Sequence, residues 1–425
     1  MRHLARSIRA GGAAVTALAV AGIGAAAVLG SISDVRAAAF HHEVPPEIPA
    51  APEQVLAEPN VSTGLDPYYD QYVAWKEQLE NQYDIEYSVQ LSLLPQWGSP
   101  KGGSAGVDFV WSPSITWKPF ADTAVGSGAF AFWMQQNQYW TGTNTPAFQT
   151  RAALLTPPSD WGANTTDYAQ LTYTHTLPGD WRWLSLTIGQ YSFGAYDTNQ
   201  YAGNAQTNFI NYALAQNATQ TYVSGDLGAY VQAAAPEQDL VFAGGFQGAT
   251  NLAGSTITTR SIAGGKDAYF LAAQWAPKLL GGGQYSVLWY AQPALPEQEL
   301  SSSRGLSFNA VQNIDPDWGL FLRANTATGT NSPIATSVSW GVVRNNPFRH
   351  DPVDQLGLGI AWNKTNLAAV EEPARNAEWV AEIYYDYTVF KGLQIAPDLQ
   401  FYFDPALAPA SGPEMVFTLR ATATF

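Results

Sequence analysis

Apolar and polar side chains alternate along the segment DIEYSVQLSLLPQWG, residues 84–98. Ile85, Tyr87 and Val89 are apolar, and the residues between them are polar. A repeat of two residues is typical of a β-strand with one apolar and one polar face. In a soluble β-sandwich the apolar face would contact a second sheet, whereas in a membrane barrel it would contact lipid.

The same alternation continues to the end of the chain and predicts sixteen strands. Their lengths cluster around the ~9–11 residues that a tilted strand needs to cross a bilayer. We expect the strands near residues 85–93, 107–117, 128–136, 168–176, 181–191, 226–233, 239–247, 268–276, 283–291, 305–312, 317–325, 337–344, 354–363, 377–388, 392–402 and 415–425.

Short and long connections broadly alternate between these segments. Tight turns are expected after residue 177 and at 236–239, 315–318 and 390–392, and long polar connections at 137–167, 192–225 and 248–267. Outer-membrane barrels combine short periplasmic turns with long outer loops in this way. An even number of strands also leaves both chain ends on the periplasmic side. The pattern therefore predicts an all-β fold, a sixteen-stranded antiparallel transmembrane β-barrel over residues 84–425.

The N-terminus has the pattern of a signal peptide. Basic residues in MRHLARSIR precede a long apolar run, and Ala37-Ala38-Ala39 fits the small-residue rule for cleavage before Phe40. We therefore assign residues 1–39 to a signal peptide. An uncleaved membrane anchor is the alternative, because the apolar run is long for a signal.

A linker and a short helix are expected before the first strand. Residues 40–64 are rich in Pro and Ala and have no periodicity, which is typical of a flexible linker. Its His41 and His42 are expected to be solvated rather than to bind a metal. Residues 65–83 predict an amphipathic periplasmic helix with Asp66 as N-cap and Pro67 in its first turn. Its apolar stripe would contain Tyr68, Tyr72, Trp75 and Leu79.

Composition favours the barrel over a soluble enzyme. Only 13% of residues are charged and 13% are aromatic, yet the chain after the N-terminus has no apolar run long enough for a transmembrane helix. Trp and Tyr suit the headgroup layer of a membrane. Aromatic residues that could form such a girdle stand near many predicted strand ends: Trp117, Trp133, Trp181, Trp183, Tyr191, Trp275, Trp289 and Trp379.

Charge and cysteine content exclude several classes of function. The net charge is −15, and removal of residues 1–39, with four Arg and one Asp, would bring it to about −18. Such an acidic chain is a poor candidate for binding nucleic acid. With no cysteine, the chain cannot form disulfides or a cysteine-based metal site.

The last strand ends on an aromatic residue. In MVFTLRATATF, Met415, Phe417 and Leu419 begin an apolar face that ends at Phe425. A final strand with a C-terminal Phe is the signal by which outer-membrane barrels are generally recognised by the insertion machinery. We therefore expect Phe425 to serve as the insertion signal.

Several segments resemble the carbohydrate-selective porins of the OprB type. They are WKEQLENQYDIEYSVQLS, LTIGQYSFGAYDTNQYAGNAQTNFINYAL, WGLFLRANTATG, and AEWVAEIYYDYTVFKGLQIAPDLQFYFDP followed by FTLRATATF, and they span most of the mature chain. The resemblance implies a sixteen-stranded outer-membrane barrel that passes sugars passively. The Pro-rich extension and the few basic residues depart from the family's pattern.

Inward-pointing polar residues are the candidates for contacting a sugar. Charged side chains make strong directional hydrogen bonds to hydroxyl groups. The alternative is that the wall charges only neutralise each other. By alternation the candidates are Arg323, Arg420, Glu382, Asp398 and Gln400. Asp197 and Asn199 could line a constriction if the 192–225 connection folds inward, or could simply form turns.

No catalytic motif is present. The chain has no Gly-x-Ser-x-Gly or His-Glu-x-x-His, and Ala263-Gly264-Gly265-Lys266 lacks the spacing of a phosphate loop. We expect no enzyme, cofactor or metal.

The sequence thus predicts a passive sugar-selective porin in the outer membrane of a Gram-negative bacterium. Its expected partners are small sugars, outer-membrane lipid and lipopolysaccharide, and the barrel-insertion machinery, with oligomerisation left open. The alternatives are a general, structural or adhesive barrel without sugar selectivity, and a secreted, soluble, β-rich carbohydrate-binding protein.

Overall fold

The computed structural model describes residues 59–425 apart from 102, 163, 224, 236–237, 252–255, 260–262 and 372. The predicted signal peptide, His41 and His42 lie outside the described residues, as does most of the predicted linker.

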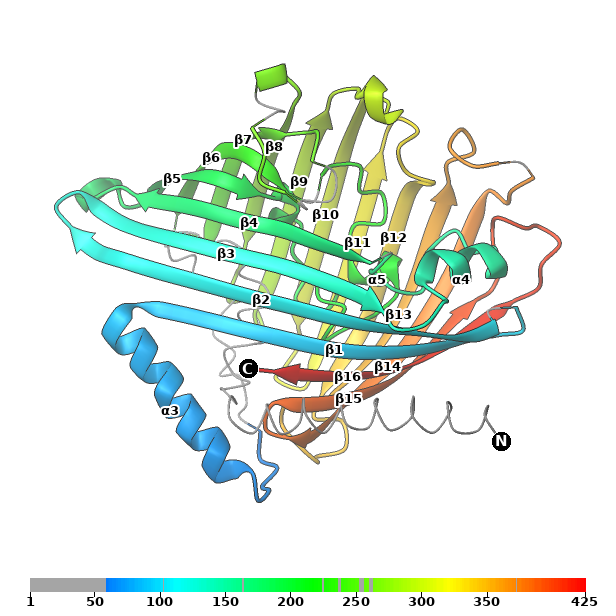
Figure 1. The fold of residues 1–425 in the computed structure, drawn as a ribbon, viewed down its shortest axis with the longest axis horizontal. Helices are drawn as coiled ribbons and strands as arrows, with labels where there is room; N and C mark the ends of the chain where they lie inside the picture. Colours follow the sequence, from blue (N-terminus) through cyan, green and yellow to red (C-terminus); the bar gives the residue numbers. More distant parts are fainter. Residues whose placement is uncertain are drawn as a thin grey trace, which may run out of the picture.

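Sixteen antiparallel strands form one closed barrel, which confirms the predicted fold (Figure 1). Each strand pairs with its neighbours in sequence, and β1 pairs with β16 to close the ring. The strands are β1 Ile85–Ser99, β2 Gly103–Thr123, β3 Gly126–Tyr139, β4 Thr165–Thr176, β5 Leu184–Tyr191, β6 Asp226–Ala235, β7 Leu240–Gly248, β8 Asp267–Trp275, β9 Gly283–Gln292, β10 Ser303–Asn313, β11 Trp318–Ala327, β12 Ile334–Asn345, β13 Gln355–Thr365, β14 Ala377–Phe390, β15 Leu393–Tyr402 and β16 Glu414–Thr424.

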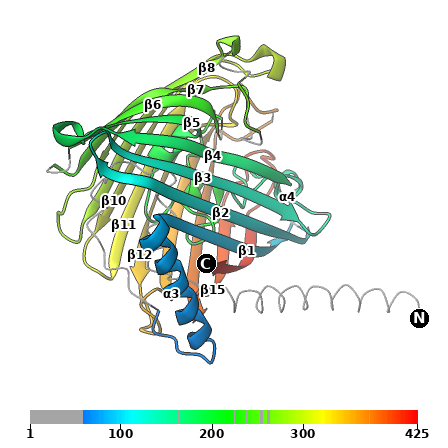
Figure 2. The ribbon, with the colours of Figure 1, turned by 60° about the vertical axis from the view of Figure 1, so that its left-hand side comes forward.

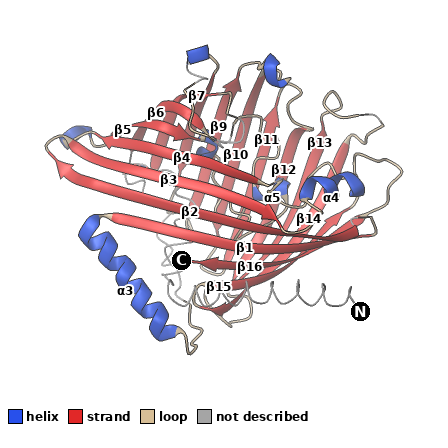
Figure 3. Cartoon of the chain, in the orientation of Figure 1, coloured by secondary structure: helices blue, strands red, loops and turns tan. Residues whose placement is uncertain are grey.

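Helices are few and short (Figure 3). The described α-helices are α3 Asp66–Tyr83, α4 Thr145–Ala152 and α5 Tyr212–Ala215, and the 3₁₀ turns include η1 Gly179–Trp181, η2 Phe193–Tyr196 and η4 Pro296–Gln298. Among the described residues no helix has the length and apolar character needed to cross a membrane.

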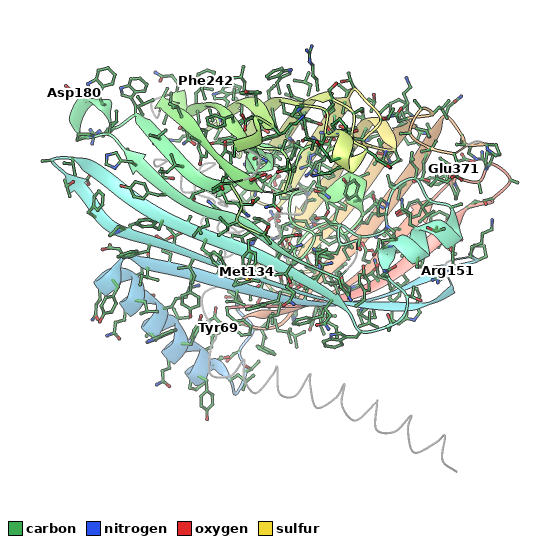
Figure 4. The ribbon with its side chains drawn as sticks, turned by 45° about the horizontal axis from the view of Figure 1, so that its top comes forward. Tyr69, Met134, Arg151, Asp180, Phe242 and Glu371 are labelled. Carbon is green, nitrogen blue, oxygen red and sulfur yellow. The ribbon has the colours of Figure 1, made fainter. Side chains whose placement is uncertain are left out.

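The outward face of the strands is mainly apolar, and most of the strands' polar side chains are buried on the inner face, together with apolar residues that pack on the inward loops. Leu358 of β13 is 52% exposed, whereas Asn363, on the inner face of the same strand, is fully buried. Phe242 of β7 is likewise 52% exposed and points outwards (Figure 4). A soluble protein would have the opposite arrangement, so the apolar face of the sequence pattern faces the surroundings.

Two predicted girdle residues, Trp133 and Tyr191, lie on the inner face of the barrel. Trp133 of β3 pairs in register with Gln170, an inner-face residue of β4 that is 3% exposed. Tyr191 is fully buried, and its hydroxyl donates to the carbonyl of Phe246 at 2.6 Å. The reason is strand parity, because Tyr191 shares its face of β5 with the buried Ser185 and Thr187. The prediction of Tyr191 and Trp133 as headgroup aromatics was therefore wrong.

Helix α3 lies beside β1 at the barrel end that carries the chain's C-terminus (Figure 2). It begins at Asp66 with Leu65 as N-cap, so the predicted cap was one residue out. The Asp66 carboxylate instead accepts hydrogen bonds from Ser62 Oγ at 2.7 Å and Thr63 N at 2.9 Å, which brace the turn before the helix.

The buried stripe of α3 is also rotated from the predicted one. Tyr69 and Tyr72 are buried, whereas Tyr68 is 58% and Trp75 49% exposed. The helix packs on the outer face of β1, and its position there, rather than its own apolar pattern, decides which residues are covered.

Two long connections fold inwards instead of projecting from the barrel. They are residues 140–164, which contain α4, and residues 192–225, which contain η2 and α5. Phe148 and Leu155 from the first, and Phe209 and Leu214 from the second, belong to one buried apolar cluster with inner residues of the barrel wall. We name these segments the β3–β4 loop and the β5–β6 loop.

Candidate functional site

The β5–β6 loop fills much of the barrel interior. Phe193 and Tyr196 pack in a cluster with Phe270 and Tyr290 of the wall. Further along, Phe209 lies edge-on to Tyr384 of β14, with 4.9 Å between the ring centroids. The start of the loop therefore packs on β8 and β9 and its middle on β14, so the loop occupies space inside the barrel that a solute would otherwise fill.

Arg420 on β16 holds this loop against the wall. Its Nη1 donates to the carbonyls of Ala205 at 2.8 Å and Asn208 at 2.5 Å. Its Nη2 forms an ion pair with Asp386 of β14 at 2.6 Å. Charge-assisted hydrogen bonds of this kind are among the stronger ones in proteins.

Glu382 on β14 holds the same loop from the neighbouring strand. Its two carboxylate oxygens accept hydrogen bonds from the backbone N–H groups of Ile210 at 2.5 Å and Asn211 at 2.9 Å. Asn211 is also the N-cap of α5, so this contact fixes the start of the helix.

Gln400 and Asp398 of β15 complete this anchoring surface. Gln400 Oε1 accepts from Asn211 Nδ2 at 3.0 Å, and Gln400 Nε2 donates to the Pro158 carbonyl at 2.8 Å. Gln400 therefore ties both inward loops to one strand. Asp398 lies next to Glu382 and accepts from Gln400 Nε2 at 3.3 Å.

Glu378 is an anchor that sequence reasoning did not single out. Its carboxylate accepts from Leu155 N at 2.7 Å, Thr156 N at 2.8 Å, Thr156 Oγ1 at 2.6 Å and Ala406 N at 3.0 Å. It thus joins the β3–β4 loop to the connection between β15 and β16. Its position four residues before Glu382 marks it as an inner residue of β14, but no signal in the sequence identifies its partners.

Arg323 and Asp197 form a different arrangement on the wall of β10 and β11. Asp197 Oδ1 accepts from Ser307 Oγ at 2.6 Å and from Asn309 Nδ2. Arg323 Nε donates to Asn309 Oδ1 at 2.7 Å, so Asn309 bridges the acid and the base. Asn199 Nδ2 reaches the same Asn309 oxygen at 3.4 Å.

Both charged residues retain hydrogen-bonding capacity. Among the described residues, Arg323 Nη1 and Asp197 Oδ2 have no hydrogen-bond partner, although the side chains are 1% and 9% exposed. Buried polar atoms are normally satisfied, so an unsatisfied pair facing the interior is a place where a ligand or water is expected.

Asp160 of the β3–β4 loop adds a second carboxylate near Arg323. Its Oδ1 accepts from Gln216 Nε2 of the other loop. Burial raises the pKa of Asp160 to about 6, and the positive charge of Arg323 opposes that rise. At pH 8 Asp160 therefore carries a negative charge within electrostatic range of Arg323, which also interacts electrostatically with Asp197.

Comparison with known proteins gives the family of this barrel. The family model described as "Carbohydrate-selective porin, OprB family" matches residues 96–425. The chain belongs to the OprB family. Among curated relatives, it is 36% identical over 354 residues to Porin AaxA of Chlamydia pneumoniae, covering 81% of this chain and 80% of that protein.

Further comparisons agree with this assignment. The chain is 34% identical over 368 residues to Porin AaxA of Chlamydia trachomatis serovar D, covering 81% of this chain and 79% of that protein. The high-pH structure of Pseudomonas putida OprB aligns with a TM-score of 0.67 at 16% identity, covering 83% of this chain and 98% of that one. This structural likeness supports the barrel fold.

As an OprB-family porin, the protein is a channel rather than an enzyme. Family and fold together place it in an outer membrane of a Gram-negative-type envelope. Within the described part of the chain, no three His, Cys, Asp or Glu side chains are grouped as metal ligands.

The expected insertion residue, Phe425, lies at the closing seam of the barrel. Its backbone N–H and C=O pair with Val89 of β1, both at 2.9 Å. Its ring is buried together with Tyr69 and Tyr72 of α3. In the folded porin this aromatic residue is therefore covered by the helix.

Proposed function

We propose that this OprB-family porin passes small sugars selectively and passively into the periplasm. The observation that carries the proposal is the unsatisfied pair Arg323 Nη1 and Asp197 Oδ2, a cation and an anion bridged by Asn309. The family description, "Carbohydrate-selective porin", supports the same substrate class.

The chemistry of this pair suits a polyol. A guanidinium group offers a planar set of N–H donors, and a carboxylate offers several acceptor positions. Adjacent sugar hydroxyls can donate to one group and accept from the other as the sugar leaves water. Hydrogen bonds to the protein replace those made with water at little net cost, so a sugar can cross down its concentration gradient without a large barrier.

The remaining predicted residues have a positioning role in this proposal. The polar groups of three of them, Arg420, Glu382 and Gln400, hydrogen-bond to the β5–β6 loop. By holding this loop in place they help to keep Asp197 at the wall of β10. Asn199 supports Asn309 from the same loop. Sugar would contact Arg323 and Asp197, whereas the anchors fix the width of the passage.

Sugar block of the ion current in planar bilayers tests the proposal. Each hydrogen bond to a charged group contributes about 1.5–3 kcal/mol. Arg323→Ala should therefore weaken sugar occupancy on the order of tenfold. Arg304→Ala is the matched control, since Arg304 is exposed at the start of β10 and should leave the block unchanged.

Two outcomes would contradict the proposal. An ion current in the unmodified porin that no sugar reduces would favour a general or structural barrel. Sugar block that survives both Arg323→Ala and Asp197→Asn would move the sugar contacts to another part of the wall.

A further inference from the structure

The charges around the β5–β6 loop are strongly unbalanced. Two guanidinium groups, Arg323 and Arg420, contact or face this loop from the wall. Six carboxyl groups contact or face the inward loops and these arginines: Asp160, Asp197, Glu378, Glu382, Asp386 and Asp398.

The imbalance remains when the carboxyl groups are counted conservatively. Glu382 and Asp398 are adjacent, and neighbouring carboxyl groups can share one proton, so the pair is counted as one negative charge. An excess of about three negative charges then remains in the part of the interior that contains the inward loops. Hydrogen bonds from backbone N–H groups orient these carboxylates but do not remove their charge.

Unpartnered acidic oxygens point to an interaction with mobile cations. Asp197 Oδ2 has no hydrogen-bond partner among the described residues. On the opposite side of the barrel, both carboxylate oxygens of Asp108 on β2 also lack one, although Asp108 is 3% exposed. A carboxylate oxygen that accepts no hydrogen bond keeps its lone pairs for another partner, and a cation has the complementary charge.

We propose that this channel passes cations in preference to anions, and that its sugars are neutral or carry an amino group, whereas sugar acids and sugar phosphates are excluded. The sugar part rests on the function proposed above. The ion part does not, because it follows from the wall charges alone. A passage lined by one sign of charge concentrates counter-ions and repels ions of the same sign.

The reversal potential across a KCl gradient at pH 8 tests the ion part. We expect K⁺ to be more permeant than Cl⁻ by a factor on the order of ten at ~0.1 M salt. The ratio should fall towards one at ~1 M, where the Debye length is only about 3 Å. A ratio at or below one in the dilute solution would overturn the proposal.

Two charge-removing variants locate the effect. Asp160→Asn and Asp197→Asn should each lower the K⁺/Cl⁻ ratio by about twofold or more, because each removes one charge beside Arg323. Asp180→Asn is the matched control, as Asp180 is exposed in the turn between β4 and β5 at the barrel rim (Figure 4). An equal effect of all three variants would overturn the assignment to the interior.

Solute uptake into porin-containing liposomes tests the sugar part. Swelling should be faster with glucose and glucosamine than with gluconate, a sugar of similar size that carries a negative charge. Gluconate entering as fast as glucose would overturn the exclusion of anionic sugars. A cation-selective current without entry of any sugar would instead remove the proposed sugar function and leave the ion selectivity standing.

Discussion

At the scale of single residues, a charged side chain inside this barrel can have either of two tasks. Arg323 and Arg420 are both 1% exposed and both lie on inner faces. Arg420 donates hydrogen bonds to two loop carbonyls and to Asp386. In Arg323, Nη1 has no hydrogen-bond partner among the described residues. The same residue type thus holds a loop in one place and keeps an unused hydrogen-bond donor in the other.

Loss of the Arg420 anchor should destabilise the porin and loosen the loop. Arg420→Met keeps most of the volume but leaves Asp386 buried without its cation, a change that costs about 3–5 kcal/mol. We expect a lower free energy of unfolding and a noisier single-channel current. Urea unfolding in detergent and bilayer recordings measure the two effects.

A second variant separates two effects of losing Arg420: the uncompensated charge of Asp386 and the lost hydrogen bonds to the loop. Arg420→Met combined with Asp386→Asn should recover a large part of the stability, because no uncompensated charge remains. The noisy current should persist, since the donors to Ala205 and Asn208 are still absent. Full recovery of a quiet current would show that Arg420 does not hold the loop.

At the scale of elements, the face of each strand decides which substitutions the barrel tolerates. Leu358→Arg places a charge on the outer face of β13, which costs about 2–4 kcal/mol at the bilayer midplane and less towards the surface. We expect a loss of about 2 kcal/mol in the free energy of unfolding from lipid vesicles.

The controls for this prediction lie on the same strand. Leu358→Met keeps the outer face apolar and should be nearly neutral. Asn363→Ser is a polar change on the inner face that adds no charge, at a position where Asn363 accepts from Ser337 Oγ at 2.8 Å. If Leu358→Arg were no more harmful than these two, the outer face would not contact lipid.

The strands were predictable from the sequence because their signal is local. All sixteen strands and the faces of β13 and β14 follow from a repeat of two residues. The first three strands extend beyond the predicted ends, since their pairing continues past the bilayer-length segment.

The inward loops could not be predicted in the same way. The partners of Glu382 are Ile210 and Asn211, about 170 residues earlier, and no pattern in either segment specifies the other. Alternation placed Glu382 on the inner face but gave no means of telling an anchor from a sugar contact. The division between Arg420 and Arg323 therefore emerges only from the folded structure.

At the scale of the whole molecule, stability depends on how the barrel closes. The ring is joined between β1 and β16, the two strands farthest apart in sequence. Helix α3 lies beside this seam (Figure 2). Its Tyr69 and Tyr72 pack in one buried cluster with Phe425. Upstream of the helix, the backbone N–H groups of Asn60 and Val61 bind Asp351, in the turn between β12 and β13. The segment before α3 is thereby fixed to the same rim.

This arrangement predicts that Phe425 acts at two separate stages. As an insertion signal it must be accessible, whereas in the folded porin it is buried beneath α3. Phe425→Ala should therefore slow assembly into the membrane and also lower the stability of the finished barrel. Tyr72→Ala should lower stability by about 1–3 kcal/mol without slowing assembly, because it removes only the cover.

A double-mutant cycle with assembly kinetics separates the two stages. Since Tyr72 and Phe425 pack in one cluster, their substitutions should couple by about 0.5–3 kcal/mol in unfolding experiments. Phe417→Ala is the matched control on the outer face of β16 and should couple with neither. Assembly is followed by the appearance of the folded form on unheated gels. If Tyr72→Ala slowed assembly as much as Phe425→Ala, docking of helix α3 would be part of the insertion step. The insertion machinery would then not recognise Phe425 before the helix covers it.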